Sequence, residues 1–398
     1  MRARPLAPYM SFRKSLNWTS AALVSLFLLV NLALLLGGGI RLGGDSPRYL
    51  EGAENLLRGL PLQGRQLSYS GYAFLIAFCR LTGAGLTGVV FTQLVLAATA
   101  SVALYDLGRR LHGHRAGLIA AGLFASNPDI ARWNAFILTD SLYISLVILS
   151  VWCVDTATRR GRYWYAIAAA PLAMAALVRP NGMFLLMVAL TYVVGRSISR
   201  QSLRWLIISG IILAFVLGAI IASRFYPPSS LEHPEVTLRK GITGINSWRV
   251  SMPAELTPIK GEWSAALGYA ARHRFAYFRL ALARVSIELI HIRPFYSIRH
   301  NIILLATLPL IYFSALLGFR LNRDRSLAHL ILLVISSHLF LVALTFADGD
   351  GRFLLYVLPL ICLFSSCAAA SLIEHYLRAR TTEAKREAGV MAGRCAGE

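Results

Sequence analysis

The sequence predicts an all-α integral membrane protein with about ten transmembrane helices, and three observations support this prediction. The 398 residues are 56% hydrophobic and 15% charged, with a mean hydropathy of +0.58, which is more apolar than a soluble core can absorb. Residues 18–40 carry no charge and are long enough to cross a bilayer at about 1.5 Å per residue. Apolar segments then recur at 84–107, 115–128, 137–155, 163–178, 182–195, 203–223, 300–318, 327–346 and 353–373.

The first apolar segment is expected to remain in the protein as a membrane span. It follows Arg2, Arg4, Arg13 and Lys14, as the apolar region of a signal peptide would. However, it is long for such a region and lacks a clear cleavage site with small residues. The segment at 115–128 is short and ends in Asn127-Pro128, so it is the weakest of the predicted spans.

Short basic loops predict the orientation of the chain. They fall on the side of the N-terminus and contain Arg109, Arg110, Arg115, Arg159, Arg160, Arg162, Arg196, Arg200, Arg204, Arg320, Arg323 and Arg325. The positive-inside rule makes this side cytoplasmic. We therefore expect one membrane domain over residues 1–375, in the cytoplasmic (inner) membrane, and a basic cytoplasmic tail over 376–398.

The net charge of +21 does not indicate a nucleic-acid partner, because the arginines lie at span ends and not in a soluble domain interleaved with aromatic residues. The five cysteines are scattered without the spacing of a metal site. No metal site is predicted, and no cofactor is certain. A divalent cation shared by Asp45 and Asp140 stays open as an alternative.

Two long segments are expected to face the periplasm or exterior. The first, residues 41–83, contains a stretch from Ser46 to Arg58 with the composition of a short interfacial helix. The second, residues 224–299, ends in an amphipathic stretch from Tyr269 to Ile292 and predicts surface helices. Its arginines would either contact anionic lipid headgroups or lie in solvent.

Polar residues gather at this outer boundary. Asp45 and Arg48 follow the first span, and the others lie at the ends of later spans: Thr139, Asp140, Arg179, Asp348, Asp350 and Arg352. A charged group at the centre of a membrane helix costs about 2.5 to 3.5 kcal/mol, so such residues usually face a cavity or a partner. Each also has a simpler interpretation: Asp45 and Asp140 as helix caps, Arg179 and Arg352 as headgroup anchors, and the two later aspartates as a turn. Their convergence on one face favours a shared site.

Such a site suits sugar transfer from a phosphate-linked donor. The reaction needs a carboxylate that accepts the acceptor's proton and cations that hold the departing phosphate. Asp45 fits the base, and Arg48, Arg179 and Arg352 fit the donor phosphate, since a guanidinium offers paired charge-assisted bonds. Because no nucleotide sugar is available outside the membrane, we expect the sugar to arrive on a lipid.

The segment GGDSPRYLEGAENLLRGLPLQGRQLSYSGYAFLIAF resembles the first outer loop of C-type (GT-C) glycosyltransferases, the family that uses polyprenyl-phosphate sugars and includes protein O-mannosyltransferases and lipid A aminoarabinose transferases. TDSLYISL, ALVRPNGMFLL and GRFLLYVLPL resemble later segments of that family. The resemblance implies an inverting glycosyltransferase with Asp45 as catalytic carboxylate and Arg48 near the donor phosphate. It also implies that Tyr49, Tyr69, Tyr72 and Asp140 contact the substrate.

The chain departs from the family pattern in three ways. Ser46 stands where many members have a second acid, and Ser68-Tyr69-Ser70 replaces the Lys-Pro-Pro of the aminoarabinose transferases. The sequence is also short, without the large soluble outer domain of several relatives, so we expect a small or lipid-linked acceptor, such as a lipid, a glycan or another cell-envelope group, and not a folded protein. Two alternatives stay open: a transporter or flippase for a lipid-linked sugar, and a ligase that takes a glycan from a polyprenyl-pyrophosphate carrier.

Overall fold

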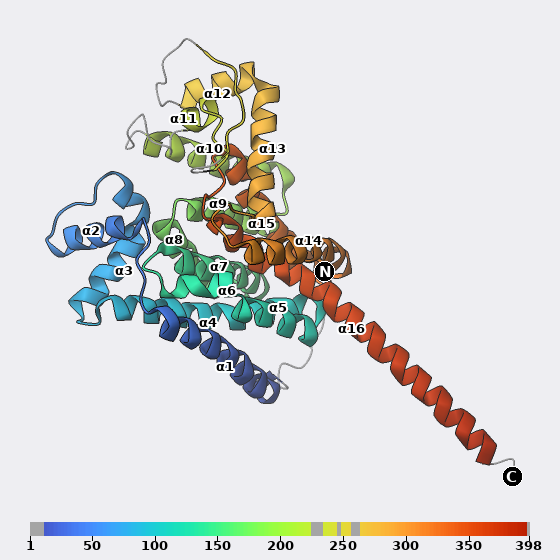
Figure 1. Cartoon of the computed structure of the whole chain (residues 1–398). Coiled ribbons are helices and arrows are strands. Elements are labelled where there is room, and N and C mark those ends of the chain that lie inside the picture. The colour runs from blue at the N-terminus through green and yellow to red at the C-terminus, as the bar shows by residue number, and fades with distance from the viewer. Residues whose placement is uncertain (1–11, 224–233, 245–247, 256–262, 396–398) are drawn as a thin grey trace.

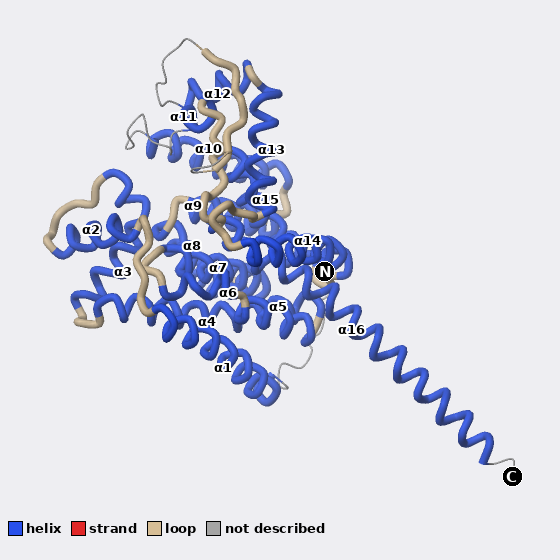
Figure 2. The backbone as a smooth tube through the Cα atoms, in the orientation of Figure 1, coloured by secondary structure: helices blue, strands red, loops and turns tan. Residues whose placement is uncertain are grey.

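Helices account for nearly all regular structure in the computed structural model, which describes residues 12–223, 234–244, 248–255 and 263–395 (Figures 1 and 2). In chain order they are α1 (Phe12–Gly38), α2 (Ser46–Leu57), η2 (Gly64–Tyr69), α3 (Ser70–Leu81), α4 (Gly85–His112), α5 (His114–Ser126), α6 (Pro128–Ala131), η3 (Arg132–Ala135), α7 (Thr139–Arg160), α8 (Arg162–Val178), α9 (Asn181–Ser197), α10 (Gln201–Ser223), α11 (Pro234–Arg239), α12 (Trp263–Arg272), α13 (Arg274–Ile290), α14 (Ile298–Leu321), α15 (Arg325–Leu344) and α16 (Arg352–Cys395). Only isolated β-bridges occur among these residues, so the all-α prediction is confirmed.

Each of the ten predicted apolar segments coincides with a helix. Within the described ranges, seven helices are long and apolar enough to cross a membrane: α1, α4, α7, α10, α14, α15 and α16. The other three, α5, α8 and α9, are shorter, with 13, 17 and 17 residues. The predicted multi-pass architecture therefore holds, with fewer full-length spans than apolar segments.

The innermost helices of the bundle are α7 and α16. In their most apolar stretches 83% and 89% of the residues are buried, whereas the corresponding values for α1 and α10 are 17% and 0%. The outer helices expose leucine and isoleucine side chains that a bilayer would cover, which explains their continuous apolar sequence. Both central helices begin at residues of the predicted site, Thr139 and Arg352.

The two predicted outer segments fold largely into helices. The stretch predicted as an interfacial helix forms α2, and η2 and α3 complete the first segment. In the second segment, α11, α12 and α13 lie together at one end of the molecule (Figure 1). Residues 224–233, 245–247 and 256–262 of that segment, the basic N-terminal residues Arg2 and Arg4, and the last three residues lie outside the described part.

Helix α16 is much longer than the membrane domain requires. It continues as a single helix through most of the basic segment 376–398 and projects beyond the bundle (Figure 1). Along its membrane part it packs closely against α14, where Gly318 lies so near Phe364 that an added Cβ would be 1.7 Å from the Phe364 carbonyl oxygen.

Replacing Gly318 by alanine is therefore expected to lower the free energy of unfolding by about 1 to 3 kcal/mol, because α14 and α16 must separate to admit the methyl group. Thermal unfolding of the detergent-solubilised chain measures this effect. Gly122→Ala in α5 is the matched control, since its Cβ would meet no atom within 4 Å. Equal stability of the two variants would contradict the close helix contact.

Candidate active site

Asp45 is fixed against the start of α7 by the backbone that precedes it. The Arg41 amide donates to the Ala135 carbonyl and the Ile137 amide donates to the Arg41 carbonyl, both at 2.9 Å. The buried Ser46 hydroxyl donates to the Ile137 carbonyl at 2.7 Å and accepts from the Gly43 amide at 2.8 Å. Ser46 thus ties the Asp45 loop to the segment leading into α7.

Asp140 lies in the first turn of α7, where it is almost completely buried. Its Oδ1 accepts a hydrogen bond from Arg179 Nη1 at 2.9 Å and another from the Tyr356 hydroxyl. The same Arg179 nitrogen donates to the Thr139 hydroxyl at 2.8 Å, and the guanidinium lies 4.9 Å from the centre of the Tyr356 ring. Arg179 reaches this position because the residue before Pro180 takes an extended conformation, which ends α8.

Arg352 joins these groups into one network. Its Nη1 lies 3.3 Å from Asp45 Oδ2 and 3.6 Å from Asp140 Oδ2. Its other guanidinium nitrogens contact Asp348, with Nη2 at 3.1 Å and Nε at 3.2 Å from the two carboxylate oxygens. The residues predicted at the ends of separate spans therefore meet around a single guanidinium.

Asp45 and Arg48 form the accessible part of the network. Their side chains are 31% and 26% exposed, whereas those of Asp140, Arg179 and Arg352 are 1%, 7% and 11% exposed. Arg48 Nη2 lies 3.4 Å from Asp45 Oδ1. A molecule arriving from outside would therefore meet Asp45 between two arginines.

The three predicted substrate-binding tyrosines form one cluster, in which Tyr69 lies beside Arg48. The Arg48 guanidinium is 5.9 Å from the centre of the half-buried Tyr69 ring. The buried Tyr49 packs against Tyr69 and Tyr72, with ring centres 5.3 and 5.2 Å apart. Tyr72 is fully buried and donates to Gln93 at 2.8 Å, so its hydroxyl already has a partner inside the protein. Contact of these tyrosines with substrate stays a prediction.

Two of the simpler interpretations, capping and headgroup anchoring, do not fit the structure, whereas Asp348 and Asp350 do lie in a turn, in which the Gly351 amide donates to the Asp348 carbonyl at 3.1 Å. Asp45 precedes α2 but makes no side-chain capping hydrogen bond, and α7 is preceded by Leu138, not capped by Asp140. Arg179 and Arg352 are buried and paired with carboxylates, which excludes headgroup anchoring as their main role.

The loop between α15 and α16 is held in place by hydrogen bonds to α13 and to the residues that follow α13. Glu288, fully buried in α13, accepts hydrogen bonds from the amides of Asp348 at 3.0 Å and Leu354 at 2.6 Å. Arg293 donates to the carbonyls of Asp348 and Gly349. Gly351 has φ of +74° and lies against the His291 ring, where a Cβ would be 2.4 Å from a ring carbon. These contacts fix the loop that presents Asp348 to Arg352.

Glu288 predicts a pH dependence of stability. Burial, reinforced by Asp348, raises its pKa to about 7 although Arg293 opposes the shift. Because the pKa of Glu288 is higher in the folded state than in the unfolded state, the folded state binds the proton more tightly. Protonation of Glu288 therefore stabilises the fold at low pH, and this stabilisation is lost as the pH rises from about 4.5 through 7. We expect the Glu288→Gln variant to lose that slope in denaturation measured from pH 5 to 8, whereas a slope identical to that of the parent chain would contradict the shift.

Several residues of this region were not predicted from the sequence. Arg284 lies in the stretch expected to have a surface face, yet it is fully buried and donates to four carbonyls, those of Thr237, Ile242, Ala343 and Leu344. Its spacing of four from Glu288 places both on one face of α13, which is the signal that could have identified them. Tyr356, one turn after Arg352, was also missed.

A shared cation between Asp45 and Asp140 receives no support from the geometry. Arg352 contacts both carboxylates, so the space next to them already holds a positive charge. Among the described residues, no group of three or more histidine, cysteine, aspartate or glutamate side chains could hold a metal ion.

The chain is similar to known proteins in part of its sequence and, over most of its length, in its fold. The family model described as dolichyl-phosphate-mannose-protein mannosyltransferase matches residues 70–222, which include Tyr72, Asp140 and Arg179 but neither Asp45 nor Arg352. A search of curated protein sequences found no match.

The fold resembles that of solved oligosaccharyltransferase structures from Archaeoglobus fulgidus. The structure in complex with an inhibitory peptide and a dolichol-phosphate is 16% identical, with a TM-score of 0.53 over 93% of this chain and 52% of that one. The apo form gives 14% identity and a TM-score of 0.50, over 94% and 52% of the two chains. The chain thus spans about half the length of these proteins. The similarity to C-type membrane glycosyltransferases that the sequence motifs indicated is confirmed, in sequence over residues 70–222 and in fold over most of the chain.

Proposed function

We propose that this protein transfers a sugar from a polyprenyl-phosphate donor to a lipid, a glycan or another cell-envelope acceptor at the outer face of the cytoplasmic membrane. The observation that carries the proposal is the position of Asp45, a partly exposed carboxylate 3.4 Å from Arg48 and 3.3 Å from Arg352. A partly exposed carboxylate between the partly exposed Arg48 and the buried Arg352 supplies both charges that the reaction needs.

In the proposed reaction, Asp45 accepts the proton of the acceptor hydroxyl as its oxygen attacks the anomeric carbon. The bond from that carbon to the phosphate oxygen breaks, and polyprenyl phosphate leaves with the electron pair. The transition state resembles an oxocarbenium ion, and a single displacement inverts the anomeric configuration. Arg48 and Arg352 stabilise the negative charge on the departing phosphate.

The three arginines are assigned different roles by their burial and partners. Arg48 and Arg352 lie beside the accessible Asp45 and are proposed to contact phosphate directly. Arg179 is enclosed, with Nη1 bonded to Thr139 and Asp140 and its guanidinium over the Tyr356 ring. We propose that Arg179 holds Asp140 in position. Asp140 Oδ2 in turn lies 3.6 Å from Arg352 Nη1. Asp140 and Arg179 are thus positioning residues in this proposal.

The similarity to a structure that contains a dolichol-phosphate supports a polyprenyl carrier as part of the donor. The apolar helices and the family match support a multi-pass membrane enzyme, and the basic loops favour an outward-facing site.

The direct test is sugar transfer by the purified full-length chain in proteoliposomes. Radiolabelled polyprenyl-phosphate sugars are supplied with a cell-envelope lipid extract as acceptor, and products are separated from donor. Label should move to the acceptor with release of polyprenyl monophosphate. Movement of intact donor across the bilayer without transfer would favour a flippase, and transfer only from a pyrophosphate-linked glycan would favour a ligase.

A further inference from the structure

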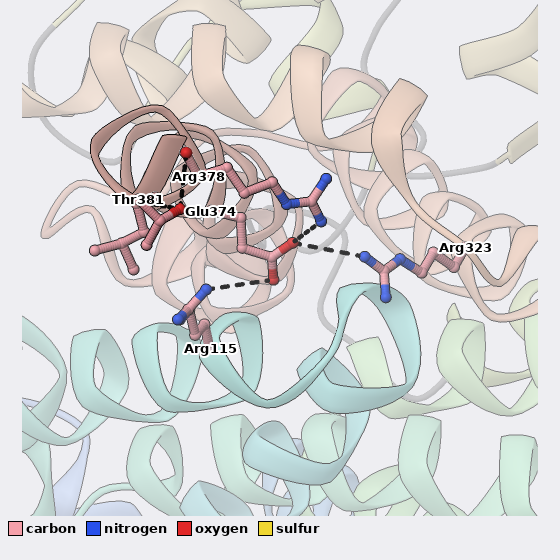
Figure 3. Close-up of a pocket in the computed structure, with 6 residues that line it drawn as sticks. Arg115, Arg323, Glu374, Arg378 and Thr381 are labelled. Carbon is pink, nitrogen blue, oxygen red and sulfur yellow. Dashed lines mark hydrogen bonds and ion pairs between the residues drawn. The ribbon is translucent and has the colours of Figure 1, made fainter. Parts of the chain in front are cut away.

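A second charged feature lies at the other end of the helix bundle. An open cavity of about 420 Å³ is lined by Arg115, Arg323, Glu374, Leu377, Arg378 and Thr381 (Figure 3). We call this feature the basic cavity. Its residues come from the start of α5, the turn between α14 and α15, and α16.

The charges in the basic cavity do not balance. Three arginines surround one carboxylate, which leaves a formal charge of +2. Figure 3 shows the guanidinium groups directed toward Glu374, and their nitrogens lie 3.8 to 3.9 Å from its carboxylate oxygens. These separations are longer than hydrogen bonds, so the pairs are loose and the guanidinium groups can turn toward another anion. The three arginines are also substantially exposed: the exposed fraction of the side chain is 45% for Arg115, 62% for Arg323 and 81% for Arg378.

The two turns that supply arginines are fastened to each other. The Arg323 amide donates to the Leu111 carbonyl at 2.7 Å, and His112 Nδ1 donates to the Leu321 carbonyl at 3.1 Å. The backbone segments that carry Arg115 and Arg323 are thereby held next to each other before any ligand arrives. A preformed site loses less conformational entropy on binding than one that must assemble.

The basic cavity lies about one bilayer thickness from Arg352. Glu374 follows Arg352 by 22 residues on the same helix, which corresponds to about 33 Å at 1.5 Å per residue. The hydrocarbon core of a bilayer is roughly 30 Å thick. The cavity is therefore at the depth of the headgroups of the opposite leaflet, the side where the short basic loops gather.

Apolar side chains continue from the basic cavity along α16. Leu377 lines the cavity, and Leu372 and Ile373 are exposed on the preceding turn, at 71% and 42%. An acyl chain could lie on these residues while its headgroup enters the cavity. We propose that the basic cavity binds the phosphate of an anionic phospholipid in the leaflet opposite the candidate active site.

The test measures phospholipid binding to the full-length chain, so it does not depend on the proposed enzymatic activity. Purified protein in detergent receives defined amounts of phosphatidylglycerol or phosphatidylcholine, and native mass spectrometry counts the retained lipid. The Arg115→Gln/Arg323→Gln variant should bind phosphatidylglycerol about 25-fold more weakly, roughly fivefold for each arginine removed. The matched control is Arg162→Gln/Arg380→Gln, which removes the same charge from exposed arginines outside the cavity and should bind as the parent chain does.

We expect the Glu374→Gln variant to change phosphatidylglycerol binding in the opposite direction. Removing the competing carboxylate raises the formal charge of the cavity from +2 to +3, so phosphatidylglycerol should bind more tightly than to the parent chain. Weaker binding to this variant, equal losses in the two double variants, or equal retention of phosphatidylcholine would each overturn the proposal. Displacement of phosphatidylglycerol by inorganic phosphate at an equal concentration would also overturn it, because the acyl chains would then contribute nothing to the affinity.

Discussion

The Asp45→Asn variant is expected to transfer sugar about 10² to 10⁴ times more slowly than the parent chain, the usual contribution of a general base. Asparagine keeps the shape of the side chain but cannot accept the proton of the acceptor hydroxyl. Folding should be little affected, because the side chain is 31% exposed and partly exposed ion pairs contribute at most about 1 kcal/mol. Initial rates with a radiolabelled polyprenyl-phosphate sugar, at equal amounts of folded protein, measure the effect.

Glu54→Gln is a suitable control for that experiment. Glu54 is an acid on the same helix, α2, and it pairs with Arg58 and Arg80 outside the network around Arg352. Its variant should keep full transfer activity. If Asp45→Asn also kept full activity, Asp45 would not be the base, although the fold and the charge network would stand.

The Arg352→Met variant is expected to lose about 3 to 5 kcal/mol of stability, because removal of one partner leaves buried charges uncompensated. The Asp140 and Asp348 side chains are 1% and 2% exposed, and Asp348 relies on this guanidinium, whereas Asp140 keeps its pair with Arg179. Denaturation of the detergent-solubilised chain measures the loss. Adding Asp348→Asn should recover part of it, since one buried negative charge then disappears with the positive one.

Arg48→Met provides the comparison for Arg352. Arg48 is 26% exposed and pairs with Asp45 alone among the carboxylates at the site, so its loss should cost less than about 1 kcal/mol. A similar small cost for Arg352→Met would mean that the buried Asp140 and Asp348 side chains do not depend on this guanidinium.

The arrangement around Asp45 could be predicted largely from the sequence. Apolar segments set the helix positions, and basic loops fixed which ends share a side, so Asp45, Asp140, Arg179 and Arg352 were expected on one face. The structure brings them together around Arg352. Their separate roles in binding or catalysis remain predictions.

The parts that escaped prediction depend on contacts across the chain. Whether an amphipathic helix faces lipid, water or protein is decided by its neighbours, so the burial of Arg284 in α13 follows from carbonyls of α15 and the residues near α11. In the same way, the Tyr356 hydroxyl reaches Asp140 only because α7 and α16 pack at the centre of the bundle. Periodicity within one segment carries no information about such partners.

The continuity of α16 has a consequence for the surrounding membrane. A single helix carries Arg352 at one boundary and Glu374 near the other, so these two charged levels cannot move independently. A bilayer with a thicker or thinner hydrocarbon core must adapt to the protein by local deformation, or the protein must tilt. Hydrophobic mismatch between the bilayer and the protein would then change the tilt of α16, the helix that holds the Arg352 guanidinium beside Asp45.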